Sequence, residues 1–535
     1  MSPSDDLFFI LPAAALAPGA SPASMGAKAH GLLQLARLGA SVPPAFVLGT
    51  GLSREYFENA GRLPARVHAL LDEGIAQLER VSGRRFGGVR QPLLLSVRSG
   101  APVSMPGMME TLLNVGLGER TLPGLLRASG NPRLVRDCYR RLISQYMQVV
   151  HGAAAAPFDA IVQRYLTEQQ LGSACELDSA SLGQIASESL AVAVAQCGVP
   201  FPQSPREQLL GAVEAVFRSW GSEKARHYRR LYGIEEHLGT AVTVQQMVFG
   251  NAGADSGAGV GFTRDPATGE RRPCIEFLFN AQGEDVVGGR HAAQDGARLA
   301  RALPQVAAEL QRLAGLLEGH FHDMQDFEFT VENGRLYLLQ TRSGKRTPWA
   351  ALRIAIDLAH EELITPAQAL EQLQGIDLEH LERTRLADAA QVRPLAQALG
   401  ASIGVASGAV VLDAQRAVRL AGEGREVILV RPDIQTQEVE AIAAAAGVLT
   451  AAGARTSHAA VVARQLGKVC LVGCEALHIE PQHAACVIGG RRIAEGDEIT
   501  LDADSGLIYP GRLDVQHERP LEEIEQVRRW RREAA

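Results

Sequence analysis

The sequence has no long apolar run, no excess of basic residues and few cysteines, and each shortage excludes a class of protein. No segment reaches the roughly 20 apolar residues that span a bilayer. The nearest, Leu7–Ala17, is interrupted by Pro12 and follows Asp5 and Asp6, where a signal peptide would carry Lys or Arg. The net charge of −7 does not indicate the basic surface that binds nucleic acid. The seven scattered cysteines are typical of reduced thiols. We therefore expect a cytoplasmic protein that binds neither membranes nor nucleic acids.

What the chain does have is length and an ordinary globular composition. Its 535 residues, 46% hydrophobic and 21% charged, exceed what one hydrophobic core organises. Short strand-like and helix-like segments alternate in both halves, separated by a stretch rich in Ala, Leu and Glu. We predict an α/β (α+β multidomain) protein in four parts: an α/β region over residues 1–345, a helical connector over 346–397, a smaller α/β domain over 398–513 and a charged helix over 514–535.

Periodicity and breaker residues predict individual elements within these parts. The expected helices are Lys28–Leu38, Pro205–Trp220, Glu223–Leu231 and His291–Leu317. The expected strands are Pro92–Val97, Ala241–Phe249 and the pair formed by Val260–Thr263 with Ile275–Phe279.

The most distinctive local pattern is the run GARTSHAAVVAR at positions 453–464. Thr456 or Ser457 fits a helix N-cap and Gly467 a helix end, so His458 falls in the first turn. Free backbone N–H groups favour an anion there, and a neutral imidazole nitrogen is a competent nucleophile toward phosphorus. From the residues alone, two interpretations remain: a histidine that receives and passes on a phosphoryl group, and a capped helix whose histidine is a polar surface residue.

Residues 326–342 alternate as a hairpin around the turn Asn333-Gly334. A two-residue loop would place Glu328 and Gln340 on opposite faces. A three-residue loop would place Asp326, Glu328 and Gln340 on one face, where their oxygen atoms suit Mg²⁺. The sequence leaves this choice open.

Two small flexible segments have the composition of phosphate cradles. One, residues 99–107, follows a strand and begins beside Arg98. The other, residues 25–31, holds Lys28 at a predicted helix start. Neither matches the P-loop pattern G-x-x-x-x-G-K-[ST].

Together these segments resemble the pyruvate, phosphate dikinase family of phosphoenolpyruvate-utilising enzymes. The resemblance runs from about Met25 to Leu513. It rests on SVRSGA at 96–101, SMPGMM at 104–109, VFRSW at 216–220, MVFGN at 247–251, NAQGED at 280–285, LQTR at 339–342 and TSHAAVVAR at 456–464.

The resemblance implies an N-terminal ATP-grasp nucleotide-binding domain and a C-terminal swivelling phosphohistidine domain. In the family a histidine attacks the β-phosphorus of ATP and AMP leaves. The γ-phosphoryl group then goes to inorganic phosphate and the remaining phosphoryl group to pyruvate. Carried onto this chain, the resemblance makes His458 the nucleophile, with Arg98 and Arg342 as catalytic cations.

The same resemblance assigns the binding residues. Mg²⁺ would be held by Glu328 and Gln340, and Thr456 matches a threonine whose phosphorylation inactivates some family members. The implied ATP-binding set is Lys28, Arg98, Met247, Val248, Glu284, Glu328, Gln340 and Arg342.

The chain departs from the family pattern in three places. Ala27, Ala29 and His30 replace Gly, Gly and Ala, and Arg455 stands where the dikinase usually has Met. The chain stops before the barrel that binds phosphoenolpyruvate and pyruvate in the family. We therefore expect a half-reaction that needs a separate barrel subunit or another acceptor protein. The alternatives are a non-catalytic ATP-binding regulator or scaffold, and a domain-truncated dikinase.

Overall fold

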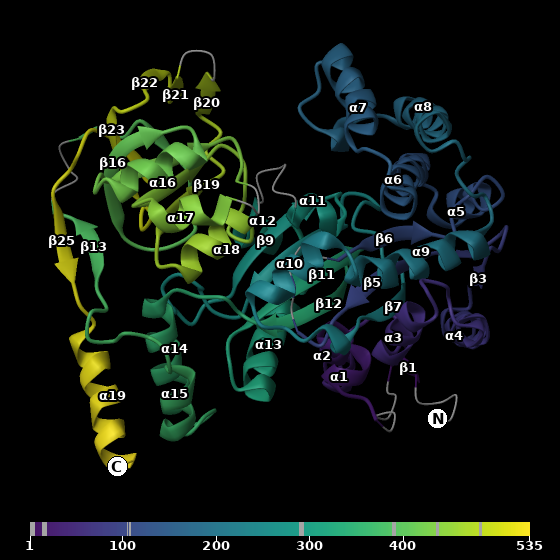
Figure 1. The fold of residues 1–535 in the computed structure, drawn as a ribbon, viewed down its shortest axis with the longest axis horizontal. Coiled ribbons are helices and arrows are strands. Elements are labelled where there is room, and N and C mark those ends of the chain that lie inside the picture. The colour runs from purple at the N-terminus through teal and green to yellow at the C-terminus, as the bar shows by residue number, and fades with distance from the viewer. Residues whose placement is uncertain are drawn as a thin grey trace. The chain divides into compact units, whose positions relative to one another are not determined.

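The chain forms two compact units, each containing helices and strands (Figure 1). The computed structural model describes residues 6–12, 19–103, 105, 109–287, 294–387, 392–434, 438–480 and 484–534. The first unit comprises Met1–Gly257 and Phe329–Thr341, and the second Ala258–Glu328 and Arg342–Ala535. The predicted mixed α/β, multidomain architecture is confirmed.

The first unit contains a five-stranded sheet, in the order β1-β2-β7-β5-β6, whose neighbouring strands all run antiparallel. Strand β5 lies inside the sheet, and its Leu95 and Val97 are fully buried. Helices α2 (Ala27–Arg37) and α9 (Pro205–Trp220) pack against this strand. The strands are β1 Leu7–Ile10, β2 Ala45–Leu48, β5 Leu95–Gly100, β6 Thr111–Val115 and β7 Ala241–Gln246.

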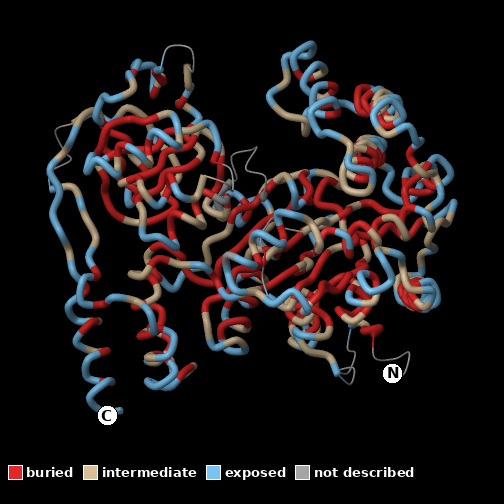
Figure 2. Tube along the Cα trace, viewed as in Figure 1, coloured by how far each residue is buried: buried red, intermediate tan, exposed pale blue. Residues whose placement is uncertain are grey.

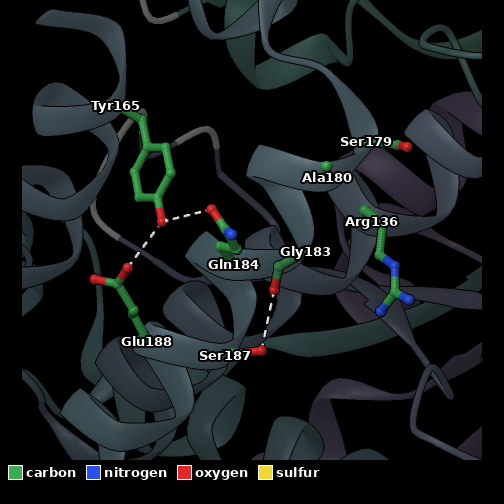
Figure 3. Close-up of a pocket in the computed structure, with 8 residues that line it drawn as sticks. All are labelled: Arg136, Tyr165, Ser179, Ala180, Gly183, Gln184, Ser187 and Glu188. Atoms are coloured by element: carbon green, nitrogen blue, oxygen red, sulfur yellow. Dashed lines mark hydrogen bonds between the residues drawn. The ribbon is translucent and has the colours of Figure 1, made fainter. Parts of the chain in front are cut away.

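Three helices of the first unit, α6 (Pro132–His151), α7 (Ala156–Gln169) and α8 (Ser179–Cys197), lie together (Figure 1). They enclose an open polar pocket of about 610 Å³ (Figure 3). Inside it the Tyr165 hydroxyl hydrogen-bonds Glu188 at 2.9 Å and Gln184 at 3.1 Å. None of the residues that the sequence predicts for ATP lines this pocket.

A second five-stranded sheet has the order β10-β9-β8-β11-β12. Strands β8 and β9 are neighbours, as predicted. The expected single helix His291–Leu317 is two helices, because Pro304 cannot continue a helix and instead begins the second one; His291 itself lies outside the described residues. The elements are β8 Gly257–Phe262, β9 Cys274–Phe279, β10 Gln294–Asp295, α12 Gly296–Ala302, α13 Pro304–Phe321, β11 Gln325–Glu332 and β12 Arg335–Ser343.

The C-terminal part of the second unit is built on an eight-stranded sheet in the order β14-β24-β23-β16-β17-β18-β19-β15. Its outer strands are β14 Ala396–Gln397, β15 Leu399–Gly400, β23 Glu498–Asp502 and β24 Leu507–Pro510. Strands β16 to β19 run parallel, and helices α16 to α18 pack on one face. A three-stranded sheet adds its apolar residues to the core on the other face. Its strands are β20 Leu477–Glu480, β21 Ala485–Ile488 and β22 Arg491–Ala494. Figure 2 shows the buried segments running through the centre of this domain. The central elements are β16 Val405–Val411, α16 Ala414–Gly422, β17 Val427–Arg431, α17 Val439–Ala444, β18 Gly447–Thr450, α18 His458–Gln465 and β19 Val469–Val472.

The segment expected to be a helical connector, residues 346–397, is helical only in its first half. Helices α14 (Pro348–His360) and α15 (Pro366–Gln372) are followed by strand β13 (Arg383–Leu386). This strand pairs antiparallel with β25 (Val515–Glu518), which precedes helix α19 (Leu521–Ala534). The hydrogen bonds of a partner about 130 residues away explain a strand that local composition does not predict.

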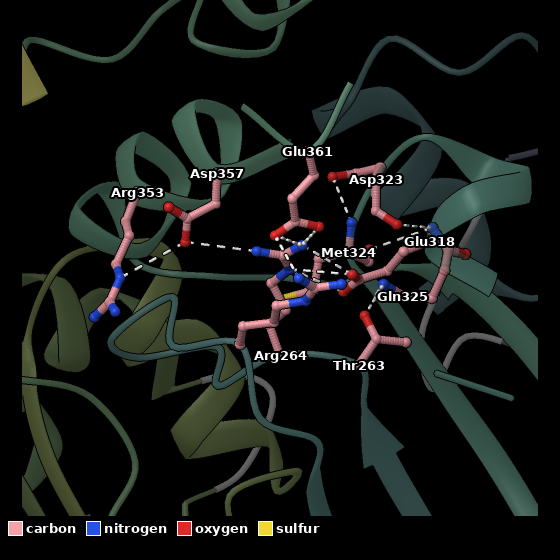
Figure 4. Close-up of polar contacts among 10 residues, drawn as sticks. Thr263, Arg264, Glu318, Asp323, Met324, Gln325, Arg353, Asp357 and Glu361 are labelled. Carbon is pink, nitrogen blue, oxygen red and sulfur yellow. Dashed lines mark hydrogen bonds and ion pairs between the residues drawn. The ribbon is translucent and has the colours of Figure 1, made fainter. Parts of the chain in front are cut away.

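The buried Arg264, which follows β8, pairs with carboxylates on α13 and at the end of α14 (Figure 4). Arg264 is fully buried and donates to Glu318 at 3.0 Å and to Glu361 at 2.9 Å. Asp357 lies 3.5 Å from the same guanidinium. The paired carboxylates compensate a charge that would otherwise be costly to bury.

Most of the other predicted elements are confirmed within a few residues. Helix α9 matches its expected bounds, as does α10 (Glu223–Leu231). Within the described ranges, no helix combines the length and apolar character that crossing a membrane requires.

Candidate functional site

Helix α2 places Lys28 at its second residue, and a glycine makes this position possible. Gly26 caps the helix at φ 79°, and the Ala27 N–H donates to Ala101 O at 2.9 Å. A Cβ on Gly26 would lie 2.1 Å from Gly100 O. Only glycine permits both this backbone conformation and this contact. The half-buried Lys28 is thereby held beside the end of β5, the strand that carries Arg98.

Arg98 connects β5 to the second strand of the predicted hairpin. Its guanidinium donates to Leu339 O at 3.3 Å, next to Gln340, which is only 5% exposed. Met247 follows β7 and is held by a hydrogen bond from its N–H to Leu94 O at 2.9 Å. The first unit therefore brings Lys28, Arg98 and the Leu339–Gln340 segment to one region. Val248, half-buried, follows Met247 directly.

The turn of the hairpin is the two-residue one, since Asn333 at φ 50° and Gly334 at φ 75° separate the strands. At the open end of the hairpin, Arg342 Nε donates to Asp326 at 2.8 Å, so these two side chains meet. Gln340 and Thr341 are both buried.

Asp326, expected to join the oxygen cluster, is instead the partner of Arg342. The carboxylate is 4% exposed and lies 2.7 Å from Arg342 Nη2. Burial raises the pKa of Asp326, and the Arg342 guanidinium opposes that shift. The pairing holds one arginine of the predicted triphosphate site in a fixed orientation. Glu328, two residues along β11, is half-buried.

Glu284 lies on the short helix α11 (Gly283–Val287), directly after β9. Its side chain is exposed, whereas the loop before it is tightly held. Asn280 has φ 52° and a buried amide oxygen without a hydrogen bond among the described residues. Gln282 N–H donates to Asp285 at 3.0 Å. Strain of this kind concentrates at functional loops.

His458 is the first residue of α18 and so lies in the first turn of a helix, as the sequence predicts. Ser457 is the N-cap, and its hydroxyl accepts from Ala460 N–H at 3.4 Å. The helix ends at Gln465, and Gly467 follows with φ 64°. The structure describes the backbone of His458 but not its side chain. The start of a helix is a position that favours a bound anion.

Glu276 on β9 is a site residue that the sequence reasoning missed. It is 5% exposed, accepts from Arg455 N–H at 2.6 Å and accepts from the Thr456 hydroxyl at 2.9 Å. A carboxylate thus holds the loop that leads into His458. One acidic residue within the apolar run CIEFLF was the only local signal.

Arg455, the unusual residue of this loop, has structural partners. Its Nε donates to Gly400 O at 2.9 Å, and its Nη1 lies 3.5 Å from Cys274 Sγ. These contacts occupy the guanidinium and help to fix the loop in place.

Comparison with known proteins is decisive for the family. Residues 62–301 and 299–362 match the family described as "Pyruvate phosphate dikinase, AMP/ATP-binding domain", more than half of the chain. The chain belongs to the pyruvate, phosphate dikinase family. Residues 423–506 additionally match "PEP-utilising enzyme, mobile domain". The family resemblance expected from the motifs is confirmed.

Curated dikinases of several organisms are similar over almost the whole chain. The pyruvate, phosphate dikinase of Clostridium symbiosum is 41% identical over 509 residues, 95% of this chain and 58% of the relative. That of Rhizobium meliloti (strain 1021) is 38% identical, with the same coverage. Pyruvate, phosphate dikinase 2 of Zea mays is 40% identical over 91% of this chain and 55% of the relative. The chain thus spans a little over half the length of these dikinases.

The dikinase-family matches enclose nearly all the predicted site residues. The nucleotide-binding match covers the predicted ATP residues from Arg98 to Arg342, and the mobile-domain match contains Thr456 and His458. Lys28 lies before the first match.

Proposed function

We propose that this chain is an ATP-dependent phosphotransferase of the dikinase type with His458 as its nucleophile. An imidazole nitrogen bonds to the β-phosphorus of ATP, the bond from that phosphorus to the bridging oxygen of the α-phosphate breaks, and AMP leaves. The γ-phosphoryl group then passes to inorganic phosphate, releasing pyrophosphate. The observation that carries this proposal is the place of His458 at the start of α18, inside the mobile-domain match.

We assign ATP binding to the residues that the family resemblance identifies. The triphosphate is neutralised by Lys28, Arg98 and Arg342, because the protein contributes to phosphoryl transfer mainly by positioning the phosphates and compensating their charge. The orientation of Arg342 by Asp326 and the fixed start of α2 support these roles. Met247 and Val248 contact the adenine, and Glu284 belongs to the same nucleotide site. The sheets that carry these residues are the proposed ATP-grasp domain.

We assign Mg²⁺ to Glu328 and Gln340. Carboxylate and amide oxygens suit this cation, which takes one or two protein ligands and fills its shell with water and phosphate oxygens. Among the described residues, no group of three or more His, Cys, Asp and Glu could hold a metal ion, in keeping with such a sparse site. When bound, the cation neutralises developing charge on the phosphates. Asp326 is not included, because its Oδ2 is paired with Arg342.

The domain that carries His458 is proposed to swivel between ATP and a second acceptor. The resemblance identifies that acceptor as pyruvate, held by a barrel outside these 535 residues, and another small molecule is the alternative. Thr456 is proposed as a regulatory position. Its hydroxyl is two residues from the nucleophile and bound to Glu276, so a phosphoryl group there would add charge beside a buried carboxylate.

The test is to incubate the chain with Mg²⁺ and ATP labelled at the β-phosphorus, with and without inorganic phosphate. Protein-bound label that is stable in base and lost in acid, with release of AMP, is expected. His458→Ala should abolish the label, whereas His478→Ala, an exposed histidine of the same domain, should retain it. An unlabelled native protein that still binds ATP would overturn the proposal.

A further inference from the structure

Arg464 is a fully buried arginine with no ion-pair partner among the residues that the structure describes. It lies in the last turn of α18, yet its side chain reaches back toward the start of the helix, as helical side chains do. All three of its hydrogen bonds go to backbone carbonyls: Nη2 to Arg455 O at 2.6 Å, Nε to Ala401 O at 3.0 Å and Nη1 to Lys345 O at 3.3 Å.

Among the described residues, no carboxylate bonds directly to this guanidinium, although the charges of Glu276, Asp265 and Asp326 act on it from a distance. The ring of Phe262 lies 5.3 Å away and offers a cation–π contact. Compare Arg264 in the same unit, equally buried but bonded to Glu318 and Glu361. A buried cation is costly unless a negative charge compensates it. Arg464 therefore lies in the interior with no direct hydrogen bond or ion pair to a carboxylate of the described residues.

Two carboxylates whose charges act on Arg464 bond to other groups. Glu276 on β9 holds Arg455 N–H and the Thr456 hydroxyl, and Asp326 on β11 holds Arg342. The titratable and charged groups whose fields reach Arg464 include Cys274 and Glu276 of β9, Asp265 after β8, Cys470 of β19 and Asp326 of β11. The Arg455 guanidinium, which contacts Cys274, is a second cation on this side. The bond to Arg455 O holds the Arg464 guanidinium beside a residue that lies three positions before His458. The extended chain between Arg455 and His458 spans at most about 11 Å.

We propose that Arg464 is a positioning residue for the phosphohistidine. Arg464 orients the loop before His458 through its bond to Arg455 O, and its positive charge compensates the negative charge of the phosphorylated histidine. This inference rests on the proposed function. A phosphoryl or pyrophosphoryl group on His458 brings several negative charges to the start of α18. The unpaired guanidinium favours that state over the free histidine, and it does so without moving, since its three carbonyl contacts already fix it.

The test compares Arg464→Met, Arg464→Lys and a control, Arg416→Met, in the full chain. Arg416 lies on the exposed face of α16 in the same domain and pairs with Glu495. The measured quantity is the fraction of protein carrying acid-labile label at a fixed ratio of ATP to AMP. Arg464→Met should lower the equilibrium constant for labelling. The expected decrease is on the order of tenfold for each negative charge of the phosphoryl group that lies about 10 Å from the guanidinium. Arg416→Met should equal the native protein.

Arg464→Lys separates charge from packing. A buried ammonium loses its proton more readily than a guanidinium, which stays charged. The labelled fraction of this variant, relative to the native protein, should approach native near pH 6.5 and fall toward the Arg464→Met value by about pH 9. A purely structural role would give a ratio that does not change with pH.

The outcomes distinguish the two proposals. Native labelling with equal labelling of Arg464→Met overturns the role of Arg464 and leaves the function intact. No labelling of the native protein overturns the function and, with it, this role. If circular dichroism shows that Arg464→Met does not fold, the pH series of Arg464→Lys decides, and a flat ratio overturns the role.

Discussion

The hydroxyl of Thr456 donates a 2.9 Å hydrogen bond to the buried carboxylate of Glu276, 180 residues away in the sequence. The adjacent Arg455 N–H donates to the other oxygen of the same carboxylate. A single carboxylate on β9 therefore accepts hydrogen bonds from two consecutive residues of the loop that leads into His458. A substitution or modification of Thr456 would alter the surroundings of this buried carboxylate.

Thr456→Asp should slow the labelling of His458 at least about tenfold, because two carboxylates would meet in a buried setting. Thr456→Ser keeps the hydroxyl and should label within about twofold of native. Rapid-quench measurement with β-labelled ATP gives both rates. Native-like labelling by Thr456→Asp would show that the contact with Glu276 does not govern the loop.

Gly26→Ala should destabilise the first unit and weaken ATP binding. The new Cβ would meet Gly100 O in a backbone conformation unfavourable for alanine. Gly39→Ala is the matched control, since Gly39 has φ 76° at the other end of the same helix and nothing within 4 Å of its Cβ position. The control should lose about 1–2 kcal/mol of unfolding free energy and Gly26→Ala about 2 kcal/mol more. Urea unfolding and ATP titration measure both effects, and equal losses would contradict the expectation.

Arg342→Met should leave Asp326 as an unpaired buried carboxylate. We expect a loss of about 1–3 kcal/mol of unfolding free energy together with loss of labelling. Adding Asp326→Asn should recover most of the stability, because the orphaned charge disappears, but not the labelling, because the cation is still missing. Denaturant unfolding and labelling of both variants test this. Recovery of labelling by the double variant would exclude Arg342 from the triphosphate site.

Asp137 should make the stability of the first unit depend on pH in the acid range. Burial alone would raise its pKa, but Arg141 and Arg140, which lie 3.0 and 2.6 Å from it, hold the pKa well below the ordinary value. The folded state therefore favours the ionised form. The stabilisation is complete above the ordinary carboxyl pKa of about 4 and is lost as the pH falls below it.

Asp137→Asn should accordingly be less stable than native at neutral pH and show a flatter decline toward acid. Asp255→Asn, at an exposed position, is the control and should follow the native curve. Urea unfolding between about pH 7 and pH 3 measures the difference. Parallel native and Asp137→Asn curves would contradict this expectation.

The sequence predicts features whose cause is local. The N-cap at Ser457, the helix start at His458 and the turn at Asn333-Gly334 follow from the preferences of a few adjacent residues. The helices α9 and α10 follow from caps and periodicity in the same way.

The features that sequence reasoning missed depend on distant partners. Glu276 joins the site only because β9 meets a loop nearly 180 residues further on. Strand β13 exists because β25 pairs with it, and the contact of Asp326 with Arg342 joins two strands of the hairpin 16 residues apart. The four-part division and the individual ATP-binding and metal-binding roles stay predictions.

The pairing of β13 with β25 has a topological consequence. Leu386 lies opposite Val515, so the chain enters and leaves the eight-stranded domain at adjacent points. After leaving it, α19 packs Ile524, Val527 and Trp530 into the same core as α14 and α15. The domain that carries His458 is thus an insertion between the two strands of the β13–β25 hairpin. If residues 387–514 were removed and β13 were joined to β25 by a two-residue turn, the core formed by α14, α15 and α19 would keep all of its own contacts.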